Sequence, residues 1–224
     1  MTPQDCAVFF DVDGVLLELT ATEEDVFFGA FAPWCEASSL SRNWNSYRIR
    51  NDDNIVDEIM EMRGIPPQLK GRIVDDYHAR MGALLTDGSL LSPAISGAAE
   101  LLASLQGKAR LGIATANFRD AARLRLTVAG LWEPVSNLAQ GADGGGHKHE
   151  ILARALNSVS VPPCRIIYVG DNVNDVEAGL RNGVHFIGFS LHQERLKQLA
   201  AAGASHLSSH HTNTRILIES LLNP

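Results

Sequence analysis

Two short apolar runs of this chain each lead directly to aspartate. Residues 7–10 are followed by Asp11 and Asp13, and residues 166–169 lead through a glycine to Asp171. Uninterrupted apolar runs of this length are typical of strands buried on both faces of a parallel sheet. Because ligands bind at the carboxyl ends of the strands in such sheets, we expect the three aspartates in one crevice.

Three carboxylates in one crevice repel one another unless a cation lies between them. Oxygen ligands of this kind favour Mg²⁺. A single aspartate at a strand end is more often a turn residue or a helix N-cap, so each one taken alone says little. Two acidic strand ends, accompanied by Gly14 and Gly170, favour a magnesium site.

The composition is that of an ordinary globular protein, 45% hydrophobic and 20% charged over 224 residues, which is enough for one core and an accessory lobe. The net charge of −7 argues against nucleic acid as a partner, because phosphate backbones are bound by clustered basic residues. No apolar run approaches the ~18 residues of a membrane span, and no signal segment precedes the first strand, so we expect no membrane partner and a cytoplasmic location. The three cysteines lack metal-ligand spacing, which argues against a disulfide framework or a zinc site.

The segment after Gly14 has helical spacing and no strand signal of comparable quality. A capping box at Thr22 and Asp25 predicts the start of a first helix, and Pro33 is expected to end it. Further apolar residues recur at helical spacing up to position 85. The predicted domains are a helical cap (15–90) and a core (1–14 and 91–224).

Beyond the cap, strand and helix patterns alternate as in a parallel α/β domain. Pro93 suits the first turn of a helix that runs through Leu105. A strand is expected at 110–115, followed by a helix with Asn117 as its N-cap. The remaining predicted elements are a weak strand at 135–138, a helix at 148–156, a strand at 166–170, a last strand at 185–189 and a terminal helix at 215–222.

Four segments at predicted strand ends or helix starts follow one another in order. They are Asp-Val-Asp-Gly-Val at 11–15, Ile-Ala-Thr-Ala-Asn at 113–117, Gly-His-Lys at 146–148 and Val-Gly-Asp-Asn-Val-Asn-Asp at 169–175. Together they resemble the four ordered motifs of the haloacid dehalogenase superfamily, and the chain is most similar to the phosphoglycolate phosphatase-like type with a helical type-one cap. The resemblance implies an α/β fold: a Rossmann-like parallel sheet core flanked by helices, with an inserted helical cap.

The resemblance assigns Asp11 as the nucleophile that forms an aspartyl-phosphate. Asp13 would protonate the leaving alkoxide and later activate water. This second acid separates phosphatases from family dehalogenases, which lack one at the matching position. The hydroxyl of Thr115 and the charge of Lys148 would hold the transferring phosphoryl oxygens. The residues predicted to bind phosphate are Thr115, Ala116, Asn117 and Lys148.

The same resemblance implies Mg²⁺ as a cofactor, held by Asp11, Asp171 and the backbone carbonyl of Asp13. Asp175 is expected to support the catalytic lysine or a metal-bound water, with helix capping as an equal alternative. Asn172 stands where relatives often have Ser or Thr, but its amide can still donate to a carboxylate, so metal binding is expected to be intact.

Substrate specificity is expected to depend on the cap. The arginines Arg42, Arg48 and Arg50, with the aromatic residues Trp44 and Tyr47, are candidates to select an anionic or ring-bearing leaving group. Of these, Arg48 and Trp44 are the predicted substrate contacts. A solvated helix face over buried aromatics is the commoner interpretation of any one such residue. His147 and His149, which flank the lysine, are read as loop histidines because no third metal ligand has a suitable spacing.

These residues predict a Mg²⁺-dependent phosphatase that acts on a small phosphorylated metabolite resembling phosphoglycolate or a sugar phosphate. A phosphomutase of the same superfamily and a catalytically idle metabolite-binding module are the alternatives. A phosphonatase is less expected, because its cap lysine forms an imine and Lys70, the lysine of this cap, lies far from the first motif. Oligomeric state is not indicated by the sequence.

Overall fold

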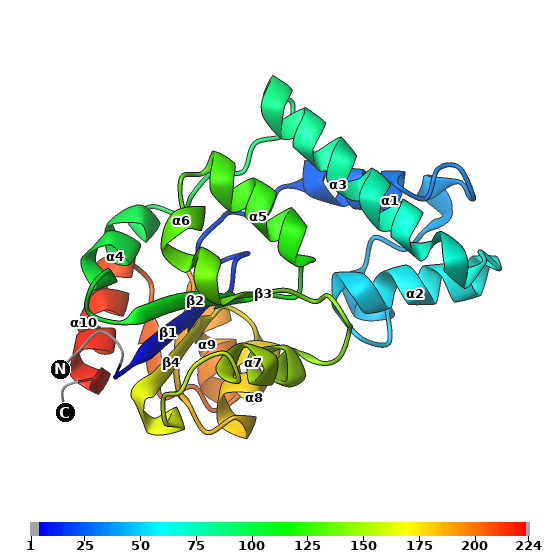
Figure 1. Ribbon diagram of the computed structural model, residues 1–224. Helices are drawn as coiled ribbons and strands as arrows, with labels where there is room; N and C mark the ends of the chain where they lie inside the picture. The colour runs from blue at the N-terminus through cyan, green and yellow to red at the C-terminus, as the bar shows by residue number, and fades with distance from the viewer. Residues whose placement is uncertain (1–4, 223–224) are drawn as a thin grey trace.

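The computed structural model describes residues 5–222, and its centre is a six-stranded parallel sheet (Figure 1). The strand order is β3-β2-β1-β4-β5-β6, and every neighbouring pair is parallel. The strands are β1 (Ala7–Phe10), β2 (Arg110–Ala114), β3 (Ala139–Gln140), β4 (Ile166–Gly170), β5 (His185–Phe189) and β6 (His206–Ser208). The predicted α/β class is confirmed.

The order of the strands reverses between β1 and β4, which are paired with each other. In doubly wound sheets such a switch point opens a crevice at the carboxyl ends of the strands. Phe10 of β1 is level with Ile113 of β2 and Val169 of β4. The residues that follow these strands therefore emerge side by side at one edge of the sheet.

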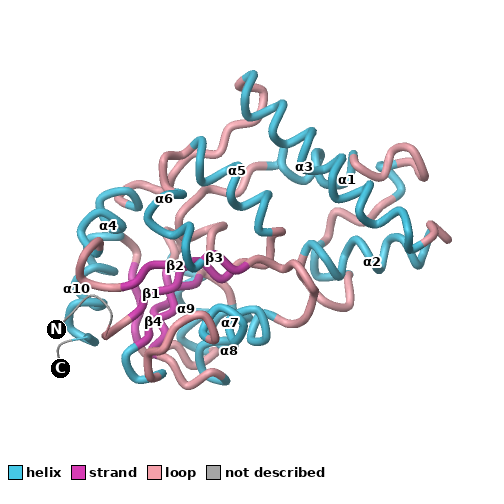
Figure 2. Tube along the Cα trace, viewed as in Figure 1, coloured by secondary structure: helices cyan, strands magenta, loops and turns pink. Residues whose placement is uncertain are grey.

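Helices cover both faces of the sheet (Figures 1 and 2). The side chains of β1 show why both faces must be covered, because all four are buried. Val8 and Phe10 pack in the apolar cluster on one face, and Ala7 and Phe9 pack in the cluster on the other. The helices on the first face are α4 (Ala98–Leu105), α5 (Arg119–Val128), α6 (Trp132–Val135) and α10 (His211–Leu222). Those on the second face are α7 (Lys148–Leu156), α8 (Val173–Arg181) and α9 (Gln193–Ala201).

A helical insert, defined here as the segment between β1 and the extended residues 93–95 that precede α4, projects to one side of the sheet (Figure 2). Its helices are α1 (Ala21–Gly29), α2 (Asp52–Arg63) and α3 (Lys70–Asp87). Its apolar cluster includes Phe27, Phe28 and Tyr77, and it continues into the core through Phe118 and Ala121, at the start of α5. The insert is therefore packed against the core along α5.

The two chain crossings between the insert and the core are paired with each other. The backbone N–H of Glu18 donates to the carbonyl of Pro93 at 3.0 Å, and that of Ile95 donates to the carbonyl of Leu16 at 2.9 Å. The predicted helix start at Pro93 is wrong for this reason: residues 93–95 are extended and pair with the other crossing, and α4 begins only at Ala98.

Other predicted element boundaries also need correction. Helix α1 begins at Ala21 after Thr20, without a side-chain cap, and ends at Gly29, so the capping box at Thr22 and Asp25 is not formed. Phe118, and not Asn117, is the N-cap residue of α5. The segment 135–138 is helical, at the end of α6 and in a 3₁₀ turn, and β3 follows it.

The carboxyl-terminal part contains more structure than predicted. Strand β6 and helix α9 follow β5, which is therefore not the last strand, and the terminal helix begins at His211 instead of Arg215. The 3₁₀ turns are η1 (Ala37–Ser39), η2 (Trp44–Ser46), η3 (Pro67–Leu69), η4 (Ser136–Leu138) and η5 (Pro163–Arg165). Over residues 5–222, no helix has the length and apolar character needed to cross a membrane.

Candidate active site

A cavity of about 240 Å³ lies at the switch point, between the carboxyl ends of the strands and the helical insert. Residues that follow β1, β2 and β4 line it together with the start of α7, as the register of these strands requires. The core residues around the reactive groups are Asp11, Asp13, Thr115, Lys148, Asp171 and Asp175. All six were singled out in the sequence.

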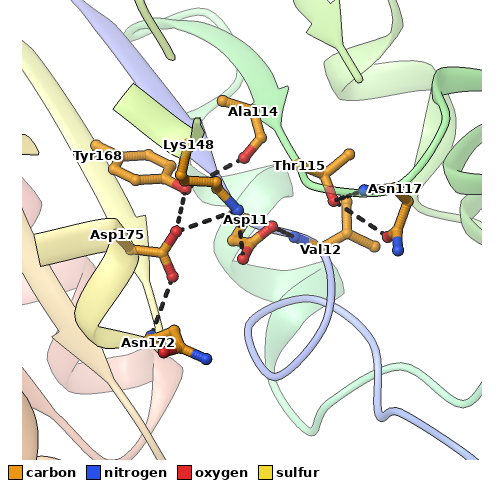
Figure 3. Close-up of polar contacts among 9 residues, drawn as sticks. All are labelled: Asp11, Val12, Ala114, Thr115, Asn117, Lys148, Tyr168, Asn172 and Asp175. Carbon is orange, nitrogen blue, oxygen red and sulfur yellow. Dashed lines mark hydrogen bonds and ion pairs between the residues drawn. The ribbon is translucent and has the colours of Figure 1, made fainter. Parts of the chain in front are cut away.

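Lys148 lies between two of these carboxylates (Figure 3). Its Nζ is 2.8 Å from Oδ2 of Asp11 and 3.1 Å from Oδ1 of Asp175. The other oxygen of Asp11, Oδ1, accepts a hydrogen bond from the backbone N–H of Val12 at 2.8 Å. Burial opposes the charge of Lys148, but the two carboxylates outweigh it and raise the pKa of the ammonium group. The lysine is therefore charged and held against Asp11.

Asp175 makes a helix-capping contact and a contact with Lys148 at the same time. Its Oδ2 accepts from the backbone N–H of Asn172 at 3.0 Å, which completes a capping box at the start of α8. Its Oδ1 accepts from the hydroxyl of Tyr168 at 2.7 Å and pairs with Lys148. Tyr168 also lies 3.1 Å from the carbonyl oxygen of Ala114, so a buried polar chain ties β2, β4, α7 and α8 together.

Thr115 follows β2 directly and is 1% exposed. Its Oγ1 lies 3.1 Å from Oδ1 of Asn117 and accepts from the backbone N–H of Asn117 at 3.2 Å. This local turn keeps Asn117 out of the N-cap position of α5 and leaves Thr115, Ala116 and Asn117 as one wall of the cavity.

The Asp171 carboxylate contacts the first motif closely. A Cβ atom on Gly14, whose φ is +74°, would come within 2.4 Å of Oδ2 of Asp171, so only glycine fits this turn. Within the described residues, Asp171 has no hydrogen bond or ion pair, and one oxygen each of Asp11, Asp171 and Asp175 lie within 4.8 Å of one another. Both oxygens of Asp175 are already engaged by protein donors.

The electrostatics of this group fit a cation. Burial, followed by the charge of Asp175, raises the pKa of Asp171. Burial also raises the pKa of Asp11, although Lys148 opposes it. Two carboxylates that resist ionisation, the buried Asp11 and the half-buried Asp171 without a protein partner among the described residues, match the oxygen donors that Mg²⁺ prefers.

Asp13 is held by a residue that the sequence did not single out. Nη2 of Arg125 lies 2.5 Å from Oδ1 of Asp13, and Nε of Arg125 lies 2.8 Å from Oε1 of Glu23, in α1 of the insert. The Arg125 side chain is 2% exposed. Its position offered a signal, because it falls three and four residues after Ala122 and Ala121, on the buried face of α5.

The start of α2 connects the insert to two of the core motifs. The backbone N–H of Asp52 donates to the carbonyl of Ala116 at 3.0 Å, and Oδ2 of Asp52 accepts from the N–H of Phe118 at 2.8 Å. Oδ1 of Asn54 accepts from the N–H of Gly146 at 2.8 Å. The insert is thus hydrogen-bonded over the cavity.

The two predicted specificity residues of the insert lie in different places. Trp44 lines the cavity, with Nε1 donating to Glu24 at 2.6 Å. Arg48 does not line it: its guanidinium pairs with Glu58 and Glu61, beside a second cavity of about 240 Å³. Arg50, which the sequence also offered as a contact with the leaving group, lines the first cavity as well. The residues of this cavity to which the sequence analysis gave no role are Leu19, Asn51, Asp52, Ile55, Asn174 and Arg195.

Comparisons with known proteins find the same fold elsewhere. Three solved structures, each below 25% identity, share the fold. A haloacid dehalogenase family hydrolase from Deinococcus radiodurans R1, with bound phosphate and sodium, is 24% identical, with 99% of each chain covered and a TM-score of 0.62. CbbY from Rhodobacter sphaeroides, in complex with phosphate, is 21% identical, with 94% of this chain and 95% of that chain covered and a TM-score of 0.70. A haloacid dehalogenase-like family protein from Streptococcus pneumoniae is 15% identical, with 96% and 98% covered and a TM-score of 0.65.

No curated protein matches the chain at a significant level. A family model of haloacid dehalogenase-like hydrolases matches residues 8–189, from the first strand through β5. This span includes the motifs that supply the cavity and the whole insert. The chain belongs to the haloacid dehalogenase-like hydrolase family.

Proposed function

We propose that this hydrolase is a Mg²⁺-dependent phosphatase that releases phosphate from a small phosphorylated metabolite through an aspartyl-phosphate. The observation that carries the proposal is the position of Asp11, whose carboxylate is fixed by Lys148 and a backbone N–H in a cavity that it shares with a second acid, Asp13. A nucleophile beside an acid, with a cation to hold the phosphoryl group, is the set of groups that this chemistry needs.

Asp11 would attack the phosphorus atom and form an aspartyl-phosphate while the ester P–O bond breaks. Asp13 would give its proton to the leaving oxygen, which departs as an alcohol. The Asp13 carboxylate would then take a proton from a water molecule that attacks the phosphorus atom of the aspartyl-phosphate. This second step restores Asp11 and Asp13 and releases inorganic phosphate.

The phosphoryl oxygens would be held by the hydroxyl of Thr115, the ammonium group of Lys148 and the backbone of Ala116 and Asn117. Asp11, Asp171 and the backbone carbonyl of Asp13 would hold Mg²⁺. When bound, the metal ion offsets the repulsion between the carboxylates and the phosphoryl oxygens. Support for this assignment comes from the unpaired carboxylate of Asp171 and its raised pKa.

The leaving group would occupy the part of the cavity that the insert closes. Trp44 and Arg50 of the insert and Arg195 of α9 line the cavity, and within residues 5–222 neither arginine side chain has an ion pair or hydrogen bond. We expect them to contact the leaving group, with an arginine suited to an anionic one. The fold relative CbbY was solved with phosphate and, as a mutant, with xylulose-(1,5)bisphosphate, which supports a phosphorylated metabolite as the substrate class.

The decisive test is a panel of phosphorylated metabolites and para-nitrophenyl phosphate, with Mg²⁺ and detection of free phosphate. Wild-type protein is expected to release phosphate. Asp11→Asn should abolish release without loss of fold, since the amide keeps the volume but removes the nucleophile. Asp13→Asn should still form some aspartyl-phosphate from activated esters, which acid quenching would trap. Turnover by Asp11→Asn within a few-fold of wild type would refute the assignment, and isomer exchange without phosphate release would indicate a mutase.

A further inference from the structure

Arg125 joins three segments that are far apart in the sequence. From α5 in the core, it reaches Asp13 in the turn after β1, Glu23 in α1 of the insert and Ser92 in the second crossing. The contacts are 2.5 Å from Nη2 to Oδ1 of Asp13, 2.8 Å from Nε to Oε1 of Glu23 and 3.3 Å from Nε to Oγ of Ser92. No other described residue links Asp13 to the insert by an ion pair.

The charges in this cluster are buried. The side chains of Arg125 and Glu23 are 2% and 6% exposed, whereas that of Asp13 is 24% exposed and lines the cavity. Burial opposes the charge of Arg125, but the two carboxylates outweigh it and raise the pKa of its guanidinium group. A buried arginine is costly to place unless it is paired on several sides, so its position is strongly determined.

We propose that Arg125 is a positioning residue for Asp13, which turns the acid toward the leaving-group oxygen. The inference rests on the proposed phosphatase function. The guanidinium holds Oδ1 of Asp13, and Oδ2, which has no hydrogen bond within the described residues, is the atom that gives and takes the proton. Nε of Arg125 donates its one hydrogen to Ser92 and lies within ion-pair distance of Glu23, so the position of the guanidinium, and with it the orientation of the acid, depends on where the insert and its crossing lie.

A purely structural role for Arg125 leads to a different expectation. If the ion pairs only stabilised the fold, a substitution would lower the amount of folded protein and all substrates would lose activity in the same proportion. If Arg125 orients the acid, the loss depends on how much the leaving group needs a proton. Phenyl phosphate and para-nitrophenyl phosphate separate the two cases, since they have similar shapes and the phenolate is far more basic.

The test compares kcat/KM for these two esters in wild type, Arg125→Lys, Asp13→Ala and the double variant, with Mg²⁺. Arg125→Lys keeps one charge but cannot reach Asp13 and Glu23 together. We expect its loss with phenyl phosphate to exceed its loss with para-nitrophenyl phosphate by about tenfold, a fraction of what general-acid catalysis supplies. In the Asp13→Ala background, Arg125→Lys should no longer change the ratio of the two substrates.

Arg123→Lys is the matched control, because Arg123 belongs to the same helix and pairs with Asp120 at the surface. It should leave the substrate ratio unchanged. Thermal unfolding establishes that each variant is folded. If Arg125→Lys is not folded, Glu23→Gln replaces it in the test. This variant keeps the shape of the partner of Arg125 and should shift the ratio of kcat/KM for the two esters in the same direction.

Equal losses with both esters, or an undiminished ratio change in the Asp13→Ala background, would overturn the positioning role. That result leaves the phosphatase proposal standing provided that Asp13→Ala itself shows the leaving-group effect. A wild-type protein that hydrolyses neither ester nor any member of the metabolite panel would instead overturn the proposed function, and this inference with it.

Discussion

His211 is a buried histidine at the start of α10. Its Nε2 lies 2.9 Å from the carbonyl oxygen of Val15, and its ring stacks on Phe189 with centroids 4.3 Å apart. Its Nδ1 is buried and has no hydrogen bond to any described residue. Burial lowers the pKa of His211 from 6.5 to about 4. Protonation would place an unpartnered N–H in an apolar site, so the folded state favours the neutral ring.

The pH dependence of stability follows from this shift. Because the pKa in the folded state is below that in the unfolded state, stability is full above pH 6.5 and is lost as the pH falls toward 4. Between pH 7 and pH 5, His211 should cost wild type about 2 kcal/mol of unfolding free energy. Urea unfolding of wild type and His211→Gln at both pH values measures this; an equal decrease in the two proteins would contradict it.

Asp171 is the carboxylate for which a bound cation should matter most, because it is half-buried and has no protein partner within the described residues. A chelator should abolish phosphatase activity, and Mg²⁺ should restore it. Ca²⁺ should inhibit, since its longer bonds and higher coordination number displace the nucleophile. Mg²⁺ should also raise the melting temperature of wild type, because a ligand stabilises the state that binds it.

Asp171→Asn should lose the Mg²⁺-dependent rise in melting temperature. Glu177→Gln is the control: Glu177 is an exposed residue of α8 that pairs with Arg181, and its variant should keep the rise. Full activity after exhaustive chelation would contradict the metal assignment, whatever the thermal data show.

At the scale of elements, the insert supplies one of the side-chain caps at the N-terminus of helix α5; the other is Asp143 of the core, which accepts from the Arg119 N–H. The N-cap residue of α5, Phe118, offers no side-chain cap, and Oδ2 of Asp52, at the start of α2, accepts from the Phe118 N–H instead. Asp52→Ala should therefore destabilise the protein by about 1–2 kcal/mol. It should also expose the Phe118 amide to hydrogen exchange.

Asp53→Ala is the neighbouring control, since Asp53 pairs with Lys70 inside the insert. It should leave the exchange rate of the Phe118 amide near that of wild type. Equal protection of this amide in Asp52→Ala and wild type would show that α2 does not cap α5 in solution.

At the scale of the molecule, the cavity lies between the core and the insert, and in the proposed reaction the core would contact the phosphoryl group while the insert would face the leaving group. Of the three arginines that the sequence offers for the leaving group, it favours Arg48, but Arg50 is the one that lines the cavity, and Arg48 is paired outside it. Arg50→Gln should change kcat/KM unequally among natural phosphate esters and little for para-nitrophenyl phosphate. Arg48→Gln should change neither. Uniform losses with Arg50→Gln would assign this residue to folding of the insert and refute its role in specificity.

Much of the site could be predicted from the sequence because many of its residues directly follow strands of the sheet. The residues that follow β1, β2 and β4 must emerge together once the strands are parallel and in register, so Asp11, Thr115 and Asp171 line one cavity. Lys148 and Asp175 belong to the same ordered motifs. The α/β class and the helical insert follow from the change between short apolar runs and helical spacing.

Only the tertiary structure decided which side chains meet between the insert and the core. Nothing near Arg125 in the sequence indicates Glu23 or Asp13 as partners, and a charge on a buried helix face looks like an exception to the pattern. The prediction that a helix starts at Pro93 was wrong for a similar reason: the carbonyl of Pro93 accepts a hydrogen bond from the Glu18 N–H of the other crossing. Local periodicity reports which face of an element is buried, but the partner of a buried polar group is set by packing between segments distant in the chain.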